Sequence, residues 1–166
     1  MKRKKNIIDE IALQMRFEEV SDAAIIALIS ESVYDFEMGD RAGATLLWHA
    51  AFLNRQDVAE WLIERGAHIN TQDENGFSAL HAATQEKHIE MVSLLLSCGA
   101  DVNILDKFGN PPICRTNLST PFELLRVLLE YGADVDIKNH YGVSCRDARA
   151  AYPDWLELFD AYDRSS

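Results

Sequence analysis

Histidine and cysteine are the residues of this sequence whose chemistry could serve catalysis or metal binding. The five histidines include no pair at i and i+4, the spacing that places two imidazoles on one helix face as metal ligands. The three cysteines, Cys98, Cys114 and Cys145, form no C-x-x-C pair and lack zinc-ligand spacing. We therefore expect no catalytic residue, no metal site and no cofactor. Three free thiols are typical of a reduced intracellular protein.

Other patterns resemble functional motifs but lack an essential group. Asp134-x-Asp136-x-Lys138 begins like a calcium loop, but lysine replaces the third oxygen ligand and no glutamate follows at position twelve. Asn117 begins a glycosylation sequon, which matters only in a secreted chain. The sequence contains no P-loop, no G-x-G-x-x-G and no G-x-S-x-G motif. An enzyme is therefore the disfavoured class of function.

Charge and hydropathy exclude two further classes. The 166 residues, a length typical of one domain, include 16 Lys and Arg against 27 Asp and Glu, a formal net charge of −11. Because the phosphate backbone repels an acidic surface, we expect no nucleic-acid partner. The longest apolar run, Ala23 to Ile29, is far shorter than the ~20 residues of a membrane-spanning helix. We expect no membrane association.

The basic residues Lys2 to Lys5 stand at the start of the chain. Asp9 and Glu10 interrupt the apolar residues that follow, so no signal-peptide core is present and a cytoplasmic location is expected. We interpret residues 1–6 as a frayed, solvated terminus. The alternative is a nuclear-localisation or membrane-surface role for the basic run.

A period of 33 residues organises the helices that must position any functional group. Two series of glycines recur at this interval: Gly43, Gly76, Gly109 and Gly142, and then Gly66, Gly99 and Gly132, each of the latter followed by alanine. Before Gly66, the apolar residues Val58, Trp61 and Leu62 have the i, i+3, i+4 spacing of an amphipathic helix. Glycine at the helix end supplies a left-handed C′ residue. Each unit thus predicts a helix, a tight turn, a second helix and an extended loop.

The second unit resembles the ankyrin repeat family most clearly, at Asp73, Gly76, Ser78, Leu80, His81, Ala83, His88, Glu90, Val92, Leu95, Gly99, Ala100 and Asn103. The resemblance implies an all-α solenoid of stacked helix-turn-helix units with extended, hairpin-like loops. We expect an N-terminal helical cap over 1–39, three repeats over 40–72, 73–105 and 106–138, and a C-terminal capping repeat over 139–166.

Departures from the family motif lead to local predictions. Trp48 and Cys114 replace the motif histidine, which bonds between repeats in the family, so the first and third repeats should depend more on packing. Two prolines beginning at Pro111 predict a short or irregular first helix in the third repeat. Thr120 is expected to cap the next helix, and Pro153 to open the last one.

In the family that this chain resembles, loop tips and first helices bind other proteins. Carrying those positions over predicts partner-binding residues at Arg41, Phe52, Leu53, Glu74, Phe77, Glu86, Leu105, Lys107, Phe108, Leu118, His140 and Tyr141. Several are large and apolar, as in a binding hot spot, and we expect at least three of them to form one exposed patch. The alternative is that several of these side chains fold inward and cover the loops.

The acidic charge and the capped architecture favour a stoichiometric binder or inhibitor of a basic protein, similar in kind to immunity proteins, that is monomeric when free. A scaffold or adaptor with several weaker partners is the alternative. The charge also has a simpler explanation, which is that it keeps the protein in solution.

Overall fold

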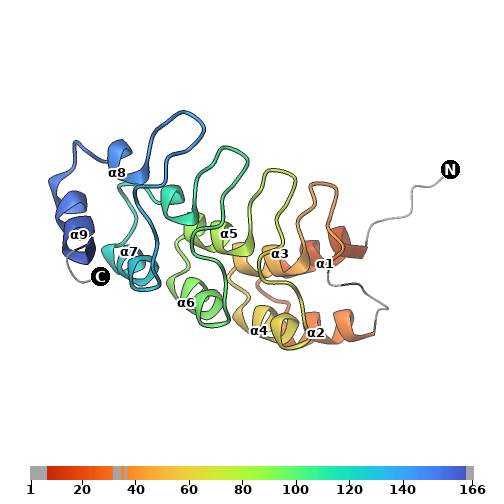
Figure 1. Cartoon of the computed structure of the whole chain (residues 1–166). Coiled ribbons are helices and arrows are strands. Elements are labelled where there is room, and N and C mark those ends of the chain that lie inside the picture. Colours follow the sequence, from red (N-terminus) through yellow and green to blue (C-terminus); the bar gives the residue numbers. More distant parts are fainter. Residues whose placement is uncertain (1–6, 32–34, 36, 164–166) are drawn as a thin grey trace.

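The computed structural model describes residues 7–31, 35 and 37–163 (Figure 1). The basic run Lys2 to Lys5, and with it the expected frayed terminus, lies outside these residues. Within them the chain forms helices and loops and no β-strand, so the expected all-α solenoid is confirmed.

Helices alternate between two rows that run the length of the molecule (Figure 1). The first row contains α1 (Ile7–Met15), α3 (Leu46–Phe52), α5 (Ala79–Glu86), the 3₁₀ helix η1 (Pro112–Arg115) and α8 (Cys145–Ala148). The second row contains α2 (Asp22–Ser30), α4 (Gln56–Glu64), α6 (Ile89–Ser97), α7 (Phe122–Glu130) and α9 (Pro153–Asp163). In the first row α3 packs between α1 and α5, and in the second row α4 packs between α2 and α6.

Helix α4 shows why these segments pack as they do. Its buried face carries Val58, Ala59 and Leu62, whereas Glu60 and Glu64 point to solvent. This distribution is the apolar stripe that the i, i+3, i+4 spacing predicts. Gly66, just beyond α4, has a φ of 92°, which confirms the left-handed residue expected after the helix.

The extended loops end in tips that repeat one hydrogen-bond pattern. In the second tip, Asp73 Oδ1 accepts hydrogen bonds from Asn75 N at 2.7 Å and Phe77 N at 2.8 Å. The corresponding residues of the other three tips bond in the same way. Asn and Asp favour such turns because the side-chain oxygen mimics a backbone acceptor.

Neighbouring tips are also joined through the backbone. Glu74 N donates to Ala42 O at 2.8 Å, Lys107 N to Asn75 O at 3.0 Å, and the last two tips are joined in the same way. The tips approach so closely that a Cβ on Gly76, whose φ is 79°, would lie 2.6 Å from Lys107 N. Glycine at this position is therefore required by its φ and by the close approach together.

The third helix pair departs from the others as the prolines predict, because its first element is the four-residue 3₁₀ helix η1. The predicted cap at Thr120 is wrong. Pro121 is the N-cap of α7, and the buried Thr120 hydroxyl accepts a hydrogen bond from Asn117 N at 2.8 Å. Because η1 is short, the connection between η1 and α7 is longer than in the other repeats, and the Thr120 side chain bonds within a turn of this connection. The final helix begins at Pro153, as expected.

One arginine ties the N-terminal helix pair to the first repeat. Arg55 donates to the backbone oxygens of Met15 at 2.9 Å, Val20 at 3.0 Å and Phe17 at 2.6 Å, and to the Asp22 carboxylate at 3.0 Å. All of these acceptors lie in or beside the loop between α1 and α2. The planar guanidinium thus holds this loop through several donors at once.

The turn between α5 and α6 offers a test of backbone strain. Lys87 has a φ of 64°, a left-handed conformation that costs an L-residue with a Cβ roughly 1–2 kcal/mol. We expect Lys87→Gly to raise the free energy of unfolding by about 1 kcal/mol, measured by urea denaturation. Asn54, the equivalent residue one repeat earlier, has a φ of 56° and belongs to a type that tolerates this region, so Asn54→Gly should have little effect. Equal effects of the two changes would contradict the strain argument.

Candidate partner-binding surface

The four loop tips form one continuous edge of the molecule (Figure 1). Arg41, Glu74, Lys107 and His140, all predicted partner-binding residues, occupy the same repeat position in consecutive tips, and all are exposed. Because each tip bonds to the next through its backbone, these side chains are held at regular intervals along the edge. Their charges are of mixed sign.

The exposed apolar candidates gather toward the third and fourth tips. Phe108 and Tyr141 occupy the same repeat position in these tips and are 49% and 76% exposed. The two tips are joined by the hydrogen bond from His140 N to Phe108 O at 2.9 Å. Leu105, just before the third tip, and Leu118, in the connection after η1, are 44% and 60% exposed. An aromatic pair on adjacent rigid tips is a suitable anchor for another protein.

The other predicted apolar residues are half-buried. Phe77 lies beneath the Arg115 guanidinium, whose carbon is 4.2 Å from the ring centroid. Phe52 stacks on Trp48 with ring centroids 5.2 Å apart. Leu53 packs against the core. Of these three, Phe77 contacts the following repeat through Arg115, whereas Phe52 contacts its own helix α3. The exposed Glu86 at the end of α5 is the remaining predicted residue.

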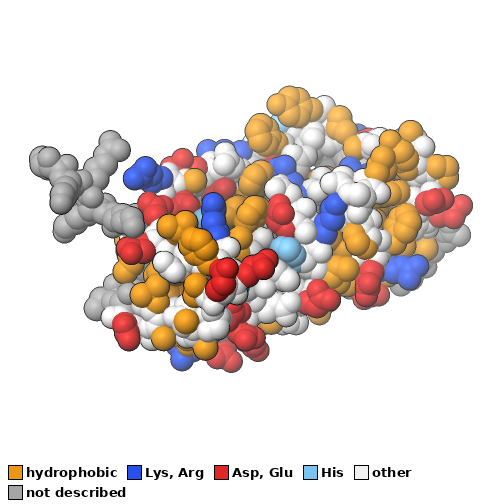
Figure 2. Space-filling view, turned by 180° about the vertical axis from the view of Figure 1, so that it is seen from behind, with side chains coloured by type: hydrophobic (Ala, Val, Ile, Leu, Met, Phe, Trp, Pro, Cys, Tyr) orange, Lys and Arg blue, Asp and Glu red, His pale blue; other side chains and the backbone are white. Residues whose placement is uncertain are grey.

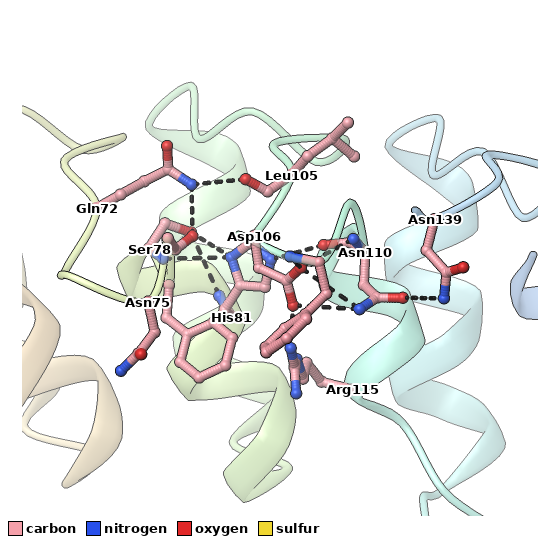
Figure 3. Close-up of polar contacts among 12 residues, drawn as sticks. Gln72, Asn75, Ser78, His81, Leu105, Asp106, Asn110, Arg115 and Asn139 are labelled. Atoms are coloured by element: carbon pink, nitrogen blue, oxygen red, sulfur yellow. Dashed lines mark hydrogen bonds and ion pairs between the residues drawn. The ribbon is translucent and has the colours of Figure 1, made fainter. Parts of the chain in front are cut away.

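The motif histidine of the second repeat forms a bond to the next repeat (Figure 3). His81 Nδ1 accepts from Ser78 N at 3.2 Å, so Nε2 carries the proton that is directed at Asn110 O, 3.2 Å away. Burial lowers the pKa of His81 to about 4, even though the bond to Asn110 favours the charged form. The neutral ring is therefore the form that the folded protein holds.

Asp106 organises the third tip (Figure 3). Its Oδ1 accepts from Phe108 N at 2.8 Å and Asn110 N at 2.9 Å, and its Oδ2 pairs with the Arg115 guanidinium. Burial raises the pKa of Asp106, but these donors outweigh burial and hold it below its ordinary value. Asn110 then accepts from Asn139 Nδ2 at 2.9 Å, which extends the network to the fourth tip.

Sequence reasoning missed the pair between Arg115 and Asp106. The first repeat contains its counterpart, in which His49 Nε2 lies 2.9 Å from Asp40 Oδ2. In both repeats a basic residue stands nine positions after the tip aspartate, immediately after the residue that replaces the motif histidine. This spacing of nine residues is the sequence signal from which the pair could have been predicted. The second repeat has Ala82 there, and His81 forms the polar contacts instead.

The described residues provide neither a metal-binding cluster nor a membrane-spanning helix. No group of three or more His, Cys, Asp or Glu side chains in this part of the chain is arranged to hold a metal ion. None of the helices described for it combines the length and the apolar character that crossing a lipid bilayer requires.

Comparisons with known proteins agree with the repeat architecture. Residues 47–96 match the family model described as ankyrin repeats (many copies). The mouse protein fem-1 homolog A-like is 32% identical over 68 residues, which are 41% of this chain and 10% of that protein. The monkeypox virus ankyrin repeat domain-containing protein OPG015 is 29% identical over 86 residues, 47% of this chain and 20% of that protein. Alpha-latrotoxin-Lg1a of Latrodectus geometricus is 35% identical over 74 residues, 43% of this chain and 5% of the toxin.

These matches span a fifth or less of the relatives' own length. Together with the stacked helix pairs and glycine turns, they support an ankyrin repeat family, whose model matches residues 47–96. Ankyrin repeats are a protein–protein interaction module, and the family is in general non-catalytic.

The buried histidine leads to a prediction of pH dependence. The pKa of His81 is about 4 when folded against an ordinary value of 6.5, so the unfolded chain binds more protons between these values. Stability should be fully present above pH 6.5 and fall as the pH decreases toward 4. We expect the urea midpoint to fall accordingly, and His81→Gln to be less stable at pH 7 but to show a shallower pH dependence. The exposed His140→Gln is the control, and an unchanged slope in His81→Gln would contradict this assignment.

Proposed function

We propose that this chain is a non-catalytic interaction module that binds one basic protein stoichiometrically and inhibits it by occupying its surface. The observation that carries the proposal is the pair Phe108 and Tyr141, exposed on adjacent tips that hydrogen bonds hold in place. Preorganised aromatic side chains lose little conformational entropy on binding and are enriched among residues that dominate interface energies.

The distribution of charge supports a basic partner. Exposed acidic residues line the second row of helices, at Asp57, Glu60, Glu64, Glu90, Glu123, Glu130, Asp154, Glu157, Asp160 and Asp163. In Figure 2 acidic side chains are spread over this face, several of them along its lower edge, and hydrophobic side chains lie between them and at the upper edge. An acidic surface with a net charge of −11 accelerates encounter with a protein of opposite charge. The aromatic tips would then supply the affinity.

We propose repeats over 40–72, 73–105 and 106–138 between capping units over 1–39 and 139–166, and a monomer in the cytoplasm before the partner binds. The three free cysteines support a reducing compartment.

An adaptor with several weaker partners is the second candidate. The mixed charges of Arg41, Glu74, Lys107 and His140 favour it, because a surface of both signs fits more than one kind of partner. An inhibitor should bind one basic partner at a ratio near one to one, whereas an adaptor should bind several partners weakly and with little dependence on salt.

An affinity pull-down from native lysate tests the proposal. It is done at low and at high salt, and the captured partners are identified by mass spectrometry. The baits are the wild-type chain, the double variant Phe108→Ala with Tyr141→Ala, and the control Tyr131→Ala. Tyr131 is a tyrosine of similar exposure, 47%, at the end of α7 and away from the tips. One dominant basic protein, captured near one to one and lost with the double variant, would support the inhibitor. Many weak, salt-tolerant partners would favour the adaptor, and no difference between the baits would reject the tips as the site.

The affinity of the captured partner provides a quantitative prediction. We expect Phe108→Ala and Tyr141→Ala each to weaken binding by about 2 kcal/mol, roughly 30-fold in Kd, by calorimetry. Both residues are exposed, so the free energy of unfolding should change by less than about 0.5 kcal/mol. By contrast, Phe77→Ala should lower stability, because its ring lies against Arg115 and His81. A loss of stability with unchanged affinity in Phe108→Ala would make that residue structural.

Association kinetics test the electrostatic part separately. Reversing the charge at two exposed sites, Glu74→Lys with Glu86→Lys, should slow association with a basic partner and reduce the dependence of the on-rate on salt. The off-rate should change less, because exposed charges act mainly on encounter. Stopped-flow measurements over a series of salt concentrations would show this, and an unchanged on-rate would remove the electrostatic argument.

A further inference from the structure

Two of the three cysteines meet across the boundary between the third helix pair and the last. Cys114 lies in η1, and Cys145 is the first residue of α8. Cys114 occupies the repeat position that His81 holds one unit earlier, and His81 also crosses to the next repeat, at Asn110. The thiol therefore takes over a position whose side chain is directed at the following repeat.

The Cys114 and Cys145 thiols lie close enough for each to shift the pKa of the other. Cys145 Sγ also lies 3.8 Å from Ile113 O, the carbonyl of the residue before Cys114. Cys145 is buried and Cys114 is half-buried, so a reagent in solvent reaches the pair through Cys114. Cys98 follows α6 at the surface and is exposed.

The backbone on both sides of this contact is held in place. The Arg149 guanidinium donates to Thr116 O, just after η1, and its carbon lies 5.1 Å from the centroid of the Trp155 ring. Arg146 N donates to Val135 O at 3.0 Å, which anchors the start of α8. The thiols are thus kept together by contacts outside the pair.

The surroundings of the sulfur atoms favour a thiolate at Cys145. The neighbouring Cys114 thiol lowers the pKa of the Cys145 thiol, and the positive charge of Arg149 acts in the same direction. The same contact and burial raise the pKa of Cys114, so the pair gives up one proton more readily than two. The positive charges of Arg149 and Arg115 oppose these effects and act to lower the pKa of Cys114.

We propose that Cys114 and Cys145 form a reversible dithiol–disulfide site that reacts with a low-molecular-weight disulfide such as oxidised glutathione. The Cys145 thiolate takes the proton of the Cys114 thiol, and the Cys114 thiolate so formed attacks one glutathione sulfur, which gives a mixed disulfide at Cys114 and releases one glutathione thiolate. The Cys145 sulfur then attacks the Cys114 sulfur and releases the second glutathione, with its own proton passing to solvent. Two protein thiols are oxidised, and one molecule of oxidised glutathione is reduced to two of glutathione.

The bond would join the most irregular repeat to the C-terminal helix pair. It links residues 31 positions apart and ties η1, the shortened first helix of the third pair, to α8. Closing a loop of this length restricts the unfolded chain, so the oxidised protein should unfold at a higher temperature than the reduced protein. Redox state would then control how firmly the fourth tip, with Tyr141, is attached to the stack.

The test is to equilibrate the full folded chain with mixtures of reduced and oxidised glutathione, alkylate the remaining thiols and map the peptides by mass spectrometry. We expect loss of two hydrogen atoms, a peptide pair linked through Cys114 and Cys145, and full alkylation of Cys98. The Tm should rise by about 5–10 °C on oxidation. Stable glutathione adducts at Cys114 without closure, or oxidation of Cys98 at the same glutathione ratio, would overturn the proposal.

Single substitutions supply matched controls. Cys98→Ser should form the bond and show the same rise in Tm as the wild type. Cys114→Ser, at a half-buried site, should form no internal disulfide and show no oxidant-dependent shift in Tm. Cys145→Ala gives the same result if it folds, which circular dichroism checks, and the Cys114→Ser result decides the question if it does not. A Tm that still rises in Cys114→Ser would assign the shift to another cause.

Discussion

Each helix pair of this protein has apolar surface on two sides, and the surface can be buried only against neighbouring pairs. In the first row α3 is covered by α1 and α5, and in the second row α4 is covered by α2 and α6. The fold is therefore a one-dimensional stack, and the contacts that hold each helix pair differ along it. The N-terminal pair is attached through Arg55, which bonds to four residues of the loop region between α1 and α2.

The loop tips follow from the same stacking. When neighbouring pairs pack, their tips come close enough for backbone hydrogen bonds and for contacts that only glycine permits, as at Gly76. The result is a rigid edge on which exposed side chains stand at regular intervals. In the function we propose, Phe108 and Tyr141 are the anchors, and the ordered edge beneath them lowers the entropic cost of binding.

The third repeat shows how a departure from the motif is accommodated. Prolines shorten its first helix, and the histidine position holds Cys114. Arg115 then pairs with the tip aspartate Asp106 and covers Phe77, while Cys114 meets Cys145 in the next unit. Charge pairing and sulfur contacts thus replace the polar bond that His81 makes in the second repeat.

The amino-acid pattern was enough to predict the resemblance to the ankyrin repeat family and the helical solenoid. It also predicted the left-handed glycine after each second helix of the repeats and the irregular start of the third repeat. These features repeat every 33 residues or depend on backbone rules for glycine and proline, so local pattern carries them. The packing of the repeats was needed to show that Thr120 closes a loop, that Phe77 lies beneath Arg115 and that two cysteines distant in the sequence are neighbours. Which apolar side chains remain exposed depends on what the neighbouring repeat places over them, and that contact has no fixed spacing in the sequence.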